Sequence, residues 1–205
     1  MEIVNPSRHF WSLSLSYKSV YHRVKYCPQL NFYFNILKHD NLEEFVNDDL
    51  INIKLSILNG SRKHRIIHDA ATFGAINIIK YLYTQINQNN CCQPRKSDMY
   101  NVCFLASKYG HLELLKHCIK QEWTNVVGAP MIAAENGHYE CLKCLHENGF
   151  SWDQNVCIKA VFYGHIECLK YAHQNGCEFD DGTYKHAFKG GDPECIKYVT
   201  EHYKH

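Results

Sequence analysis

The chain has 205 residues and a formal net charge of +1, so its overall charge does not direct it toward nucleic acid or a membrane surface. Hydrophobic residues make up 45% of the composition, which is enough for a continuous core. No stretch approaches the ~18 consecutive apolar residues of a membrane helix, and the N-terminus lacks a compact apolar signal region, so we expect neither membrane insertion nor secretion.

The first predicted element is a helix near the N-terminus, where apolar residues recur at helical spacing: Leu13, Tyr17, Val20, Tyr21 and Val24. Further along, residues 35–46 read as a degenerate copy of the repeats that follow, with Asp40 in the place of a glycine. The basic cluster Arg62-Lys-His-Arg65 with His68 is narrower than the basic face of most nucleic-acid binders. We expect this cluster to be a solvated loop.

Four glycine-centred segments then recur every 27 residues: Gly110-His-Leu-Glu-Leu-Leu-Lys116, Gly137-His-Tyr-Glu-Cys-Leu-Lys143, Gly164-His-Ile-Glu-Cys-Leu-Lys170 and Gly191-Asp-Pro-Glu-Cys-Ile-Lys197. A less regular copy is centred on Gly74, and the 36 residues from Gly74 to Gly110 predict an insertion within 87–98. A fixed period of this size is typical of a stack of small structural units.

Each repeat has the pattern of two helices joined by a turn. Apolar residues four, five and eight positions after the glycine form one helical stripe, which predicts a B helix after it. An alanine four positions before the glycine lies in an A helix, which the glycine closes in a left-handed conformation. The acidic residues and serines that follow Asn148-Gly149 and Asn175-Gly176 are suited to cap the next A helix.

The segment from Ala133 to Gly149, Ala-Ala-Glu-Asn-Gly-His-Tyr-Glu-Cys-Leu-Lys-Cys-Leu-His-Glu-Asn-Gly, resembles an ankyrin repeat. The resemblance covers about residues 31–205, although the period is 27 residues instead of about 33 and the Thr-Pro-Leu-His opening is absent. It implies an all-α solenoid of five to six helix-turn-helix units with short or absent β-turn fingers. The cysteine-rich form looks like the divergent ankyrin repeats of large DNA viruses that infect amoebae.

The N-terminal segment, residues 1–30, resembles the second half of an F-box. The residues that carry this resemblance are Leu13, Leu15, Tyr17, Val20, Tyr21 and Val24. The resemblance implies docking to a Skp-type adaptor of a cullin ubiquitin ligase, but the Leu-Pro-x-Glu opening of the family has no match in residues 1–10. The alternative is a helical cap that shields the apolar face of the first repeat. The end units of a solenoid need such a segment with a polar outer face.

Cysteine and histidine residues recur with the repeat. Three of the eleven cysteines, Cys141, Cys168 and Cys195, occupy the register of Leu114 and Ile78, so we expect buried thiols in a reducing compartment, either cytoplasm or nucleus. Cys141-x-x-Cys144 has the spacing of a zinc half-site, but its register favours a structural role. His111, His138 and His165 occur once per unit, and we expect each to bond backbone in the inter-helix turn. No catalytic motif is present, and we expect no enzymatic activity, metal or cofactor.

The positions that vary between repeats predict where a partner protein binds. These are the two residues before each glycine, at the end of each A helix, and the candidates are Phe73, Lys108, Tyr109, Glu135, Asn136, Phe162, Tyr163 and Lys189. We expect a protein-interaction scaffold that binds its partner on the concave face of the repeat array and is monomeric when alone. The alternatives are a ubiquitin-ligase substrate receptor and a structural component of a larger assembly. We expect Trp123 and Trp152 to link neighbouring units. The alternative role of Phe162 is packing between units.

Overall fold

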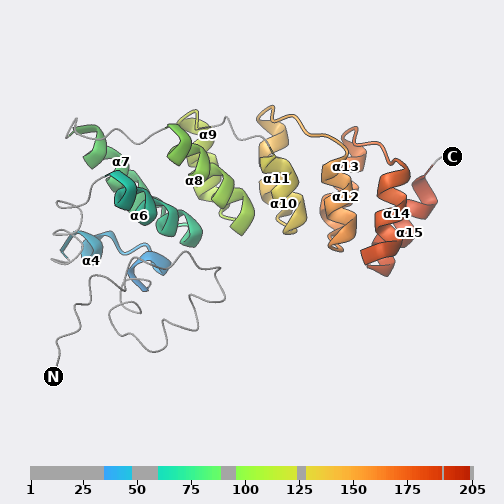
Figure 1. The fold of residues 1–205 in the computed structure, drawn as a ribbon, viewed down its shortest axis with the longest axis horizontal. Coiled ribbons are helices and arrows are strands. Elements are labelled where there is room, and N and C mark those ends of the chain that lie inside the picture. Colours follow the sequence, from blue (N-terminus) through green and yellow to red (C-terminus); the bar gives the residue numbers. More distant parts are fainter. Residues whose placement is uncertain (1–34, 48–59, 89–95, 124–127, 191, 204–205) are drawn as a thin grey trace, which may run out of the picture.

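The computed structural model describes residues 35–47, 60–88, 96–123, 128–190 and 192–203. Across these ranges every regular element is a helix, and the helices stack side by side into an elongated array (Figure 1). The fold is therefore an all-α, ankyrin-like helical solenoid, as the repeat period predicts. The N-terminal residues 1–30, with their cap and F-box alternatives, lie outside the described residues.

The helices come in pairs that follow the predicted A–turn–B order. The complete pairs are α6 (Gly60–Phe73) with α7 (Ile76–Gln88), α8 (Lys96–Tyr109) with α9 (Leu112–Lys120), α10 (Ala129–Glu135) with α11 (Tyr139–Glu147), α12 (Asn155–Phe162) with α13 (Ile166–Gln174), and α14 (Asp181–Gly190) with α15 (Pro193–His202). A shorter pair precedes them, made of the helical residues 35–38 and of α4 (Leu42–Asn47).

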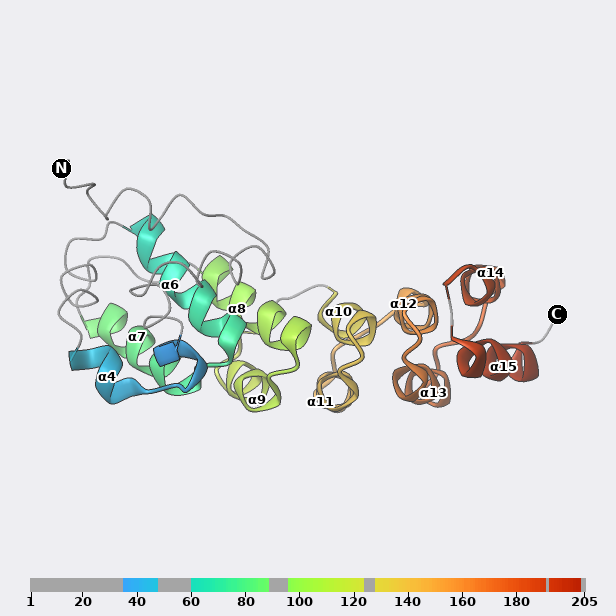
Figure 2. The same ribbon diagram turned by 90° about the horizontal axis from the view of Figure 1, so that it is seen from below.

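The pairs form two layers, which Figure 2 shows along the stack. One layer holds the A helices α6, α8, α10, α12 and α14, and the other holds the B helices α7, α9, α11, α13 and α15. Neighbouring A helices contact each other more extensively than neighbouring B helices do. The small alanines of the A helices explain this closer approach, because Ala70, Ala106, Ala133, Ala160 and Ala187 are all completely buried.

The core between the layers is filled by the predicted B-helix stripe. Cys141, Cys168 and Cys195 are at most 1% exposed, as are Leu114 and Ile78 in the same register. The prediction that these cysteines act as small core residues is confirmed. Burial also raises the pKa of the Cys141 and Cys168 thiols to about 12 and that of Cys195 to about 11.

Glycine closes α6, α8, α10 and α12 in the left-handed region, as expected. The φ angles of Gly74, Gly110, Gly137 and Gly164 lie between 72° and 76°. The residue after the glycine then donates its N–H to the carbonyl of the alanine that lies four positions before the glycine. One example is the bond from His138 N to Ala133 O at 2.9 Å. This bond satisfies a carbonyl that the helix end would otherwise leave unpaired.

Two acidic residues cap A helices in the way the sequence predicts. Asp153 accepts the N–H of Asn155 at 3.0 Å, at the start of α12. Asp180 accepts both the N–H of Thr183 at 2.7 Å and its hydroxyl at 2.8 Å, at the start of α14. These bonds hold the pKa of Asp180 below its usual value.

The expected insertion at 87–98 includes helical residues. Helix α7 continues to Gln88 and α8 begins at Lys96, so residues at both ends of that range are helical. The added length extends both helices: α7 has 13 residues and α8 has 14, whereas α11 has 9 and α10 has 7.

The tryptophans lie between units, as expected. Trp152 stacks on His146, with centroids 4.1 Å apart, and meets Tyr171 of the next unit edge-on at 6.0 Å. Trp123 packs against Tyr83 of the preceding unit at 4.9 Å. Each indole therefore joins two B helices.

Candidate protein-binding face

The residues predicted to bind a partner lie at the C-terminal ends of the A helices, beside the turns. We call these positions the A-end ridge: Thr72–Phe73, Lys108–Tyr109, Glu135–Asn136, Phe162–Tyr163 and Lys189–Gly190. The A helices pack side by side (Figure 2), so their C-terminal ends, and the ridge with them, run along one edge of the A layer. A row of variable side chains on a repeated backbone is suited to contact an extended surface.

A histidine from the following unit supports the backbone of the ridge at three junctions. The Nε2 atoms of His111, His138 and His165 lie 2.8, 3.0 and 3.1 Å from the carbonyl oxygens of Thr72, Lys108 and Glu135. Since a carbonyl only accepts, each Nε2 carries the proton and donates it. The predicted bond to backbone is present, but it crosses to the preceding unit and does not stay within the turn of the same unit.

The same histidine rings cover the glycines of the preceding unit. A Cβ added to Gly74, Gly110 or Gly137 would lie 2.5–2.6 Å from the Nδ1 of the next unit's histidine. Burial lowers the pKa of His138, and the neighbouring histidines contribute in the same direction. The neutral ring is therefore the form that the fold stabilises.

The histidine–glycine contact is absent at the first and last junctions. An aspartate stands in the glycine place at the first junction and in the histidine place at the last. Asp40 stands in the glycine place with φ of 48°, and its carboxylate accepts the N–H groups of Asn77 at 2.8 Å and Ile78 at 3.0 Å. It thereby caps α7 of the next unit. At the other end Asp192 occupies the histidine place, and a Cβ on Gly164 would lie 3.1 Å from the Cβ of Asp192.

Tyr163 is the most exposed aromatic residue of the ridge. Its side chain is 47% exposed, although its ring is supported by Phe162 at 5.1 Å and by the ammonium group of Lys159 at 5.7 Å. Tyr109 is half-buried and packs on the core, with the Lys108 ammonium 5.4 Å from its ring centre. Phe73 also packs on the core.

Other ridge residues already have partners inside the chain. The carboxylate of Glu135 pairs with Lys159 of the next A helix at 2.9 Å. Asn136 is exposed, but its side-chain amide donates to the carbonyl of Ile132 at 2.8 Å and so ends α10. Phe162 packs toward α14, where its ring lies 6.1 Å from that of His186. Lys189 is exposed.

The structure thus places all eight predicted partner-binding residues along one ridge and gives them unequal access to solvent. Tyr163, Asn136 and Lys189 are exposed, whereas the other five are half-buried. Sequence reasoning missed Lys159, which is one turn before Tyr163 and therefore next to it on the helix surface. The F-box-like residues Leu13, Leu15, Tyr17, Val20, Tyr21 and Val24 lie outside the described residues.

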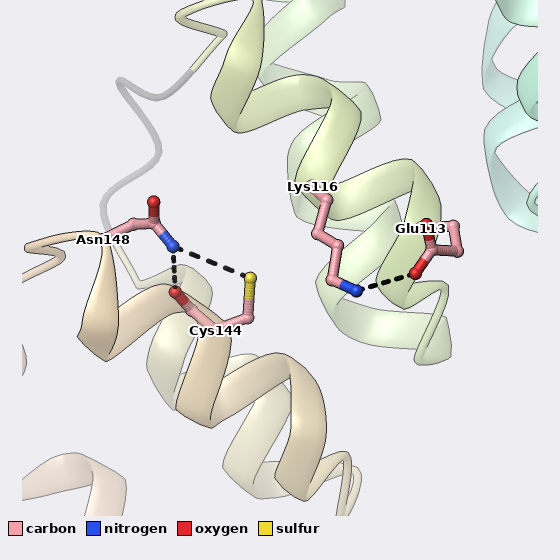
Figure 3. Close-up of polar contacts among 4 residues, drawn as sticks. All are labelled: Glu113, Lys116, Cys144 and Asn148. Carbon is pink, nitrogen blue, oxygen red and sulfur yellow. Dashed lines mark hydrogen bonds and ion pairs between the residues drawn. The ribbon is translucent and has the colours of Figure 1, made fainter.

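The Cys141-x-x-Cys144 pair divides between two surfaces of α11. Cys141 belongs to the core, while Cys144 lies beside Asn148, whose amide donates to the Cys144 carbonyl at 2.7 Å and lies 3.8 Å from its sulfur (Figure 3). Burial raises the pKa of the Cys144 thiol, and Lys116 of α9 partly opposes this. Lys116 is itself paired with Glu113 at 2.8 Å. The neutral thiol is a poor nucleophile and metal ligand.

Metal-binding and membrane-spanning features were searched in the part of the chain that the structure describes. No cluster there brings together three side chains of the histidine, cysteine or acidic type in a way that would hold a metal ion. In the same ranges, none of the helices has the length and apolar character needed to cross a membrane.

The two-layer stack and the ridge define the class of an ankyrin-like repeat protein. Residues 130–205 match the family model for ankyrin repeats, in three copies, which covers the units from α10 to α15. No curated protein matches the chain. Ankyrin repeats generally mediate binding to protein partners, so the match supports a protein-interaction role for this part of the chain.

Proposed function

We propose that the chain is a protein–protein interaction scaffold that holds its partner along the A-end ridge. The observation that carries this proposal is the ring of Tyr163, which is 47% exposed on the ridge. Phe162 and Lys159 hold the ring in place in the free protein. The Tyr163 side chain therefore loses little conformational entropy when a partner binds. Preorganised aromatic residues are frequent hot spots of protein interfaces.

Lys108 and Lys189 extend the ridge on either side with exposed or half-exposed ammonium groups. Charged groups at the rim of an interface steer association more than they add affinity. The partner is therefore held mainly by Tyr163 and Tyr109, and the lysines contribute to the rate of encounter. Glu135 and Phe162 act chiefly by fixing neighbouring units, because their side chains already contact Lys159 and α14.

The test is an affinity capture from cell lysate with mass spectrometry, followed by binding measurements on the purified partner. Tyr163→Ala should weaken binding by at least about 2 kcal/mol, as the loss of a hot-spot aromatic residue does. Phe188→Ala is the matched control, since Phe188 is 56% exposed but lies outside the ridge. A partner that binds wild type and Tyr163→Ala equally would contradict the proposed ridge.

A second candidate is a substrate receptor of a cullin-type ubiquitin ligase. The pattern from Leu13 to Val24 favours it, because it resembles the adaptor-binding half of an F-box. A purified Skp-type adaptor should then bind the full chain, and Val20→Asp should abolish that binding without affecting the ridge partner. If the segment is only a cap, the adaptor binds neither form and Val20→Asp lowers the stability of the repeats.

The resemblance of the cysteine-rich repeats to those of large DNA viruses supports a third candidate, a component of a larger viral assembly. We place the protein in the cytoplasm or nucleus of the host cell. The eight cysteines of the described residues are all buried free thiols, which suits a reducing compartment. Co-purification with assembled particles, instead of capture of a host protein, would favour this candidate over the scaffold.

A further inference from the structure

Two buried thiols lie against each other in the α12–α13 unit: that of Cys157, on α12, and that of Cys177, on the segment between α13 and α14. The Sγ atom of Cys157 lies 3.6 Å from the carbonyl oxygen of Cys177. The Sγ atom of Cys177 lies 3.8 Å from the carbonyl oxygen of Asp153, which precedes α12. The two cysteines are 0% and 3% exposed, so this contact is part of the core.

The sister units place other residues at these two positions. The residues one repeat period earlier are Pro130 and Phe150, and those two periods earlier are Cys103 and Trp123. In all three units the N–H of the later residue donates to a carbonyl near the end of the B helix, at 2.9–3.1 Å, so the backbone has the same course. An aromatic residue therefore meets the needs of packing at the later position, and the α12–α13 unit is the one of these three with sulfur at both.

A second pair of neighbouring thiols differs in how it is held. Cys103 of α8 and Cys118 of α9 also hydrogen-bond to each other, but both lie within helices and both are completely buried. Sulfur atoms in hydrogen-bond contact must still approach to the ~2.05 Å of a disulfide. Two packed helices supply that movement only by disturbing a close-packed core, whereas Cys177 lies outside the helices and its segment can shift.

The surroundings of Cys177 favour attack by its sulfur. The hydrogen bond from the Cys157 thiol lowers the pKa of Cys177, although burial opposes the shift, and the same bond raises the pKa of Cys157. Cys177 is therefore the first of the two to ionise, and the thiolate is the nucleophilic form. The neighbouring residues Gly176 and Glu178 are exposed, and no atom lies within 4 Å of a Cβ added to Gly176, so a small oxidant needs only a local movement to reach the sulfur.

We propose that Cys157 and Cys177 form a reversible disulfide site whose oxidant is a peroxide. In the first step the Cys177 sulfur attacks one oxygen of hydrogen peroxide, the O–O bond breaks, and a sulfenic acid and one water form. In the second step the Cys157 sulfur attacks the Cys177 sulfur, the S–O bond breaks, and the hydroxyl group leaves as water with the Cys157 proton. The two thiols lose two electrons in all, which reduce one peroxide to two waters. A dithiol returns these electrons and reopens the bond.

The disulfide would close a covalent loop that contains the whole of α13 and joins α12 to the segment that leads into α14. Such a loop restricts the unfolded chain, so the oxidised protein should unfold at a higher urea concentration than the reduced one. Cys141 and Cys168, whose thiols burial keeps neutral, remain packing residues. The inference does not depend on the proposed binding function, because neither Cys157 nor Cys177 belongs to the A-end ridge.

The test is disulfide mapping of the purified full chain after treatment with hydrogen peroxide. Remaining thiols are blocked with N-ethylmaleimide, and digestion with trypsin and a glutamate-specific protease separates Cys157 from Cys144. We expect a linked pair of peptides that carry Cys157 and Cys177 to form well before any link between Cys103 and Cys118, and dithiothreitol to remove it. The urea midpoint should rise on oxidation and return after reduction. This part uses wild type alone, so it does not depend on how a variant folds.

Two serine variants test the order of attack, and a third is the matched control. In Cys157→Ser the sulfenic acid on Cys177 has no thiol to resolve it, so dimedone should label Cys177, whereas Cys177→Ser should give no label at Cys157. Cys118→Ser removes a thiol from the other pair and should form the link between Cys157 and Cys177 as wild type does. Circular dichroism checks that the helices of each variant remain formed.

Three outcomes would each overturn the proposal. The first is the absence of the link between Cys157 and Cys177 in wild type after peroxide treatment. The second is a link that forms only when the chain is unfolded in urea. The third is a link between Cys103 and Cys118 that forms at an equal rate, because the position of Cys177 outside the helices would then give it no advantage.

Discussion

The glycine that ends each of α6, α8 and α10 meets two separate requirements. Its φ is positive, which costs a residue with a side chain about 1–2 kcal/mol. At three junctions a histidine ring from the next unit also occupies the space that a Cβ would fill. The sequence shows the recurring glycine and the recurring histidine, but not that they belong to one contact between units.

Alanine substitutions separate these two requirements. Gly149→Ala affects a residue with φ of 81° and no atom within 4 Å of an added Cβ, so it should cost only the conformational strain, about 1–2 kcal/mol. Gly137→Ala adds a contact of 2.6 Å with His165 and should cost about 1–3 kcal/mol more. Urea unfolding measures both. Equal losses would mean that the histidine ring moves away without cost.

The histidine links make stability depend on pH in a defined direction. Burial lowers the folded-state pKa of His138, so protonation favours the unfolded chain. The stabilisation that neutral His138 contributes is complete above its pKa in the unfolded chain, about 6.5. It is lost as the pH falls from that value to the lower pKa of His138 in the folded chain. We expect the midpoint of urea unfolding to decrease between neutral and mildly acidic pH.

His138→Gln provides the control, since glutamine keeps an N–H donor for the Lys108 carbonyl but does not titrate. The variant should show a smaller decrease over the same pH interval. Burial also lowers the pKa values of His117 and His173, so these residues account for part of the decrease that remains in the variant. An unchanged pH dependence in the variant would show that the pKa of His138 is the same in the folded and the unfolded chain.

At the scale of helices, the short first pair is joined to α7 by the carboxylate of Asp40. Two hydrogen bonds, to the N–H groups of Asn77 and Ile78, replace the histidine link of later junctions. Asp40→Ala should cost about 0.5–2 kcal/mol, the usual effect of removing a cap. Amide hydrogen exchange should detect the loss locally, as faster exchange at Asn77 and Ile78.

Asp40→Gly is the matched variant for this prediction. Glycine adopts the positive φ of 48° without strain but provides no carboxylate. Both variants should therefore expose the two amides, while only the alanine variant strains the backbone. Protection retained in Asp40→Gly would show that the carboxylate does not hold the start of α7.

The helices of the regular repeats were predictable because the repeats agree with one another, whereas the cluster Arg62–Arg65, which we expected to be a loop, lies in α6. The stripe at Leu114, Cys141, Cys168 and Cys195 determines the B helices, and the glycines determine where the A helices end. The helix lengths around the insertion were not predictable. A polar segment that extends a helix and one that forms a loop have similar compositions. The same limit applies to the ridge, where Tyr163 and Phe162 are adjacent aromatic residues with different exposure.

For the whole molecule, a stack in which each unit contacts only its neighbours should open from a unit with fewer contacts. The α14–α15 pair has one neighbour in the described chain, leaves Phe188 exposed, and lacks the histidine link because Asp192 stands in its place. A missing hydrogen bond of this kind is worth about 0.5–1.5 kcal/mol. We expect α14 and α15 to unfold before α10 to α13.

Hydrogen exchange with mass spectrometry measures this order. Amides of α14 and α15 should exchange faster than those of α11 and α13 at the same pH. Slower exchange in α14–α15 than in the central pairs would contradict the nearest-neighbour description.

Gly110 contacts His138 and Gly137 contacts His165, in each case 28 residues later, and this pairing determines how such an array can change its length. If residues 138–164 were removed, Gly137 would be followed directly by His165, whose ring would then cover Gly110 and reach the Lys108 carbonyl. Duplication of the same block would restore the pattern just as completely. Whole periods can therefore be lost or gained in one genetic step without a compensating substitution, and the longer interval between Gly74 and His111 keeps the same contact.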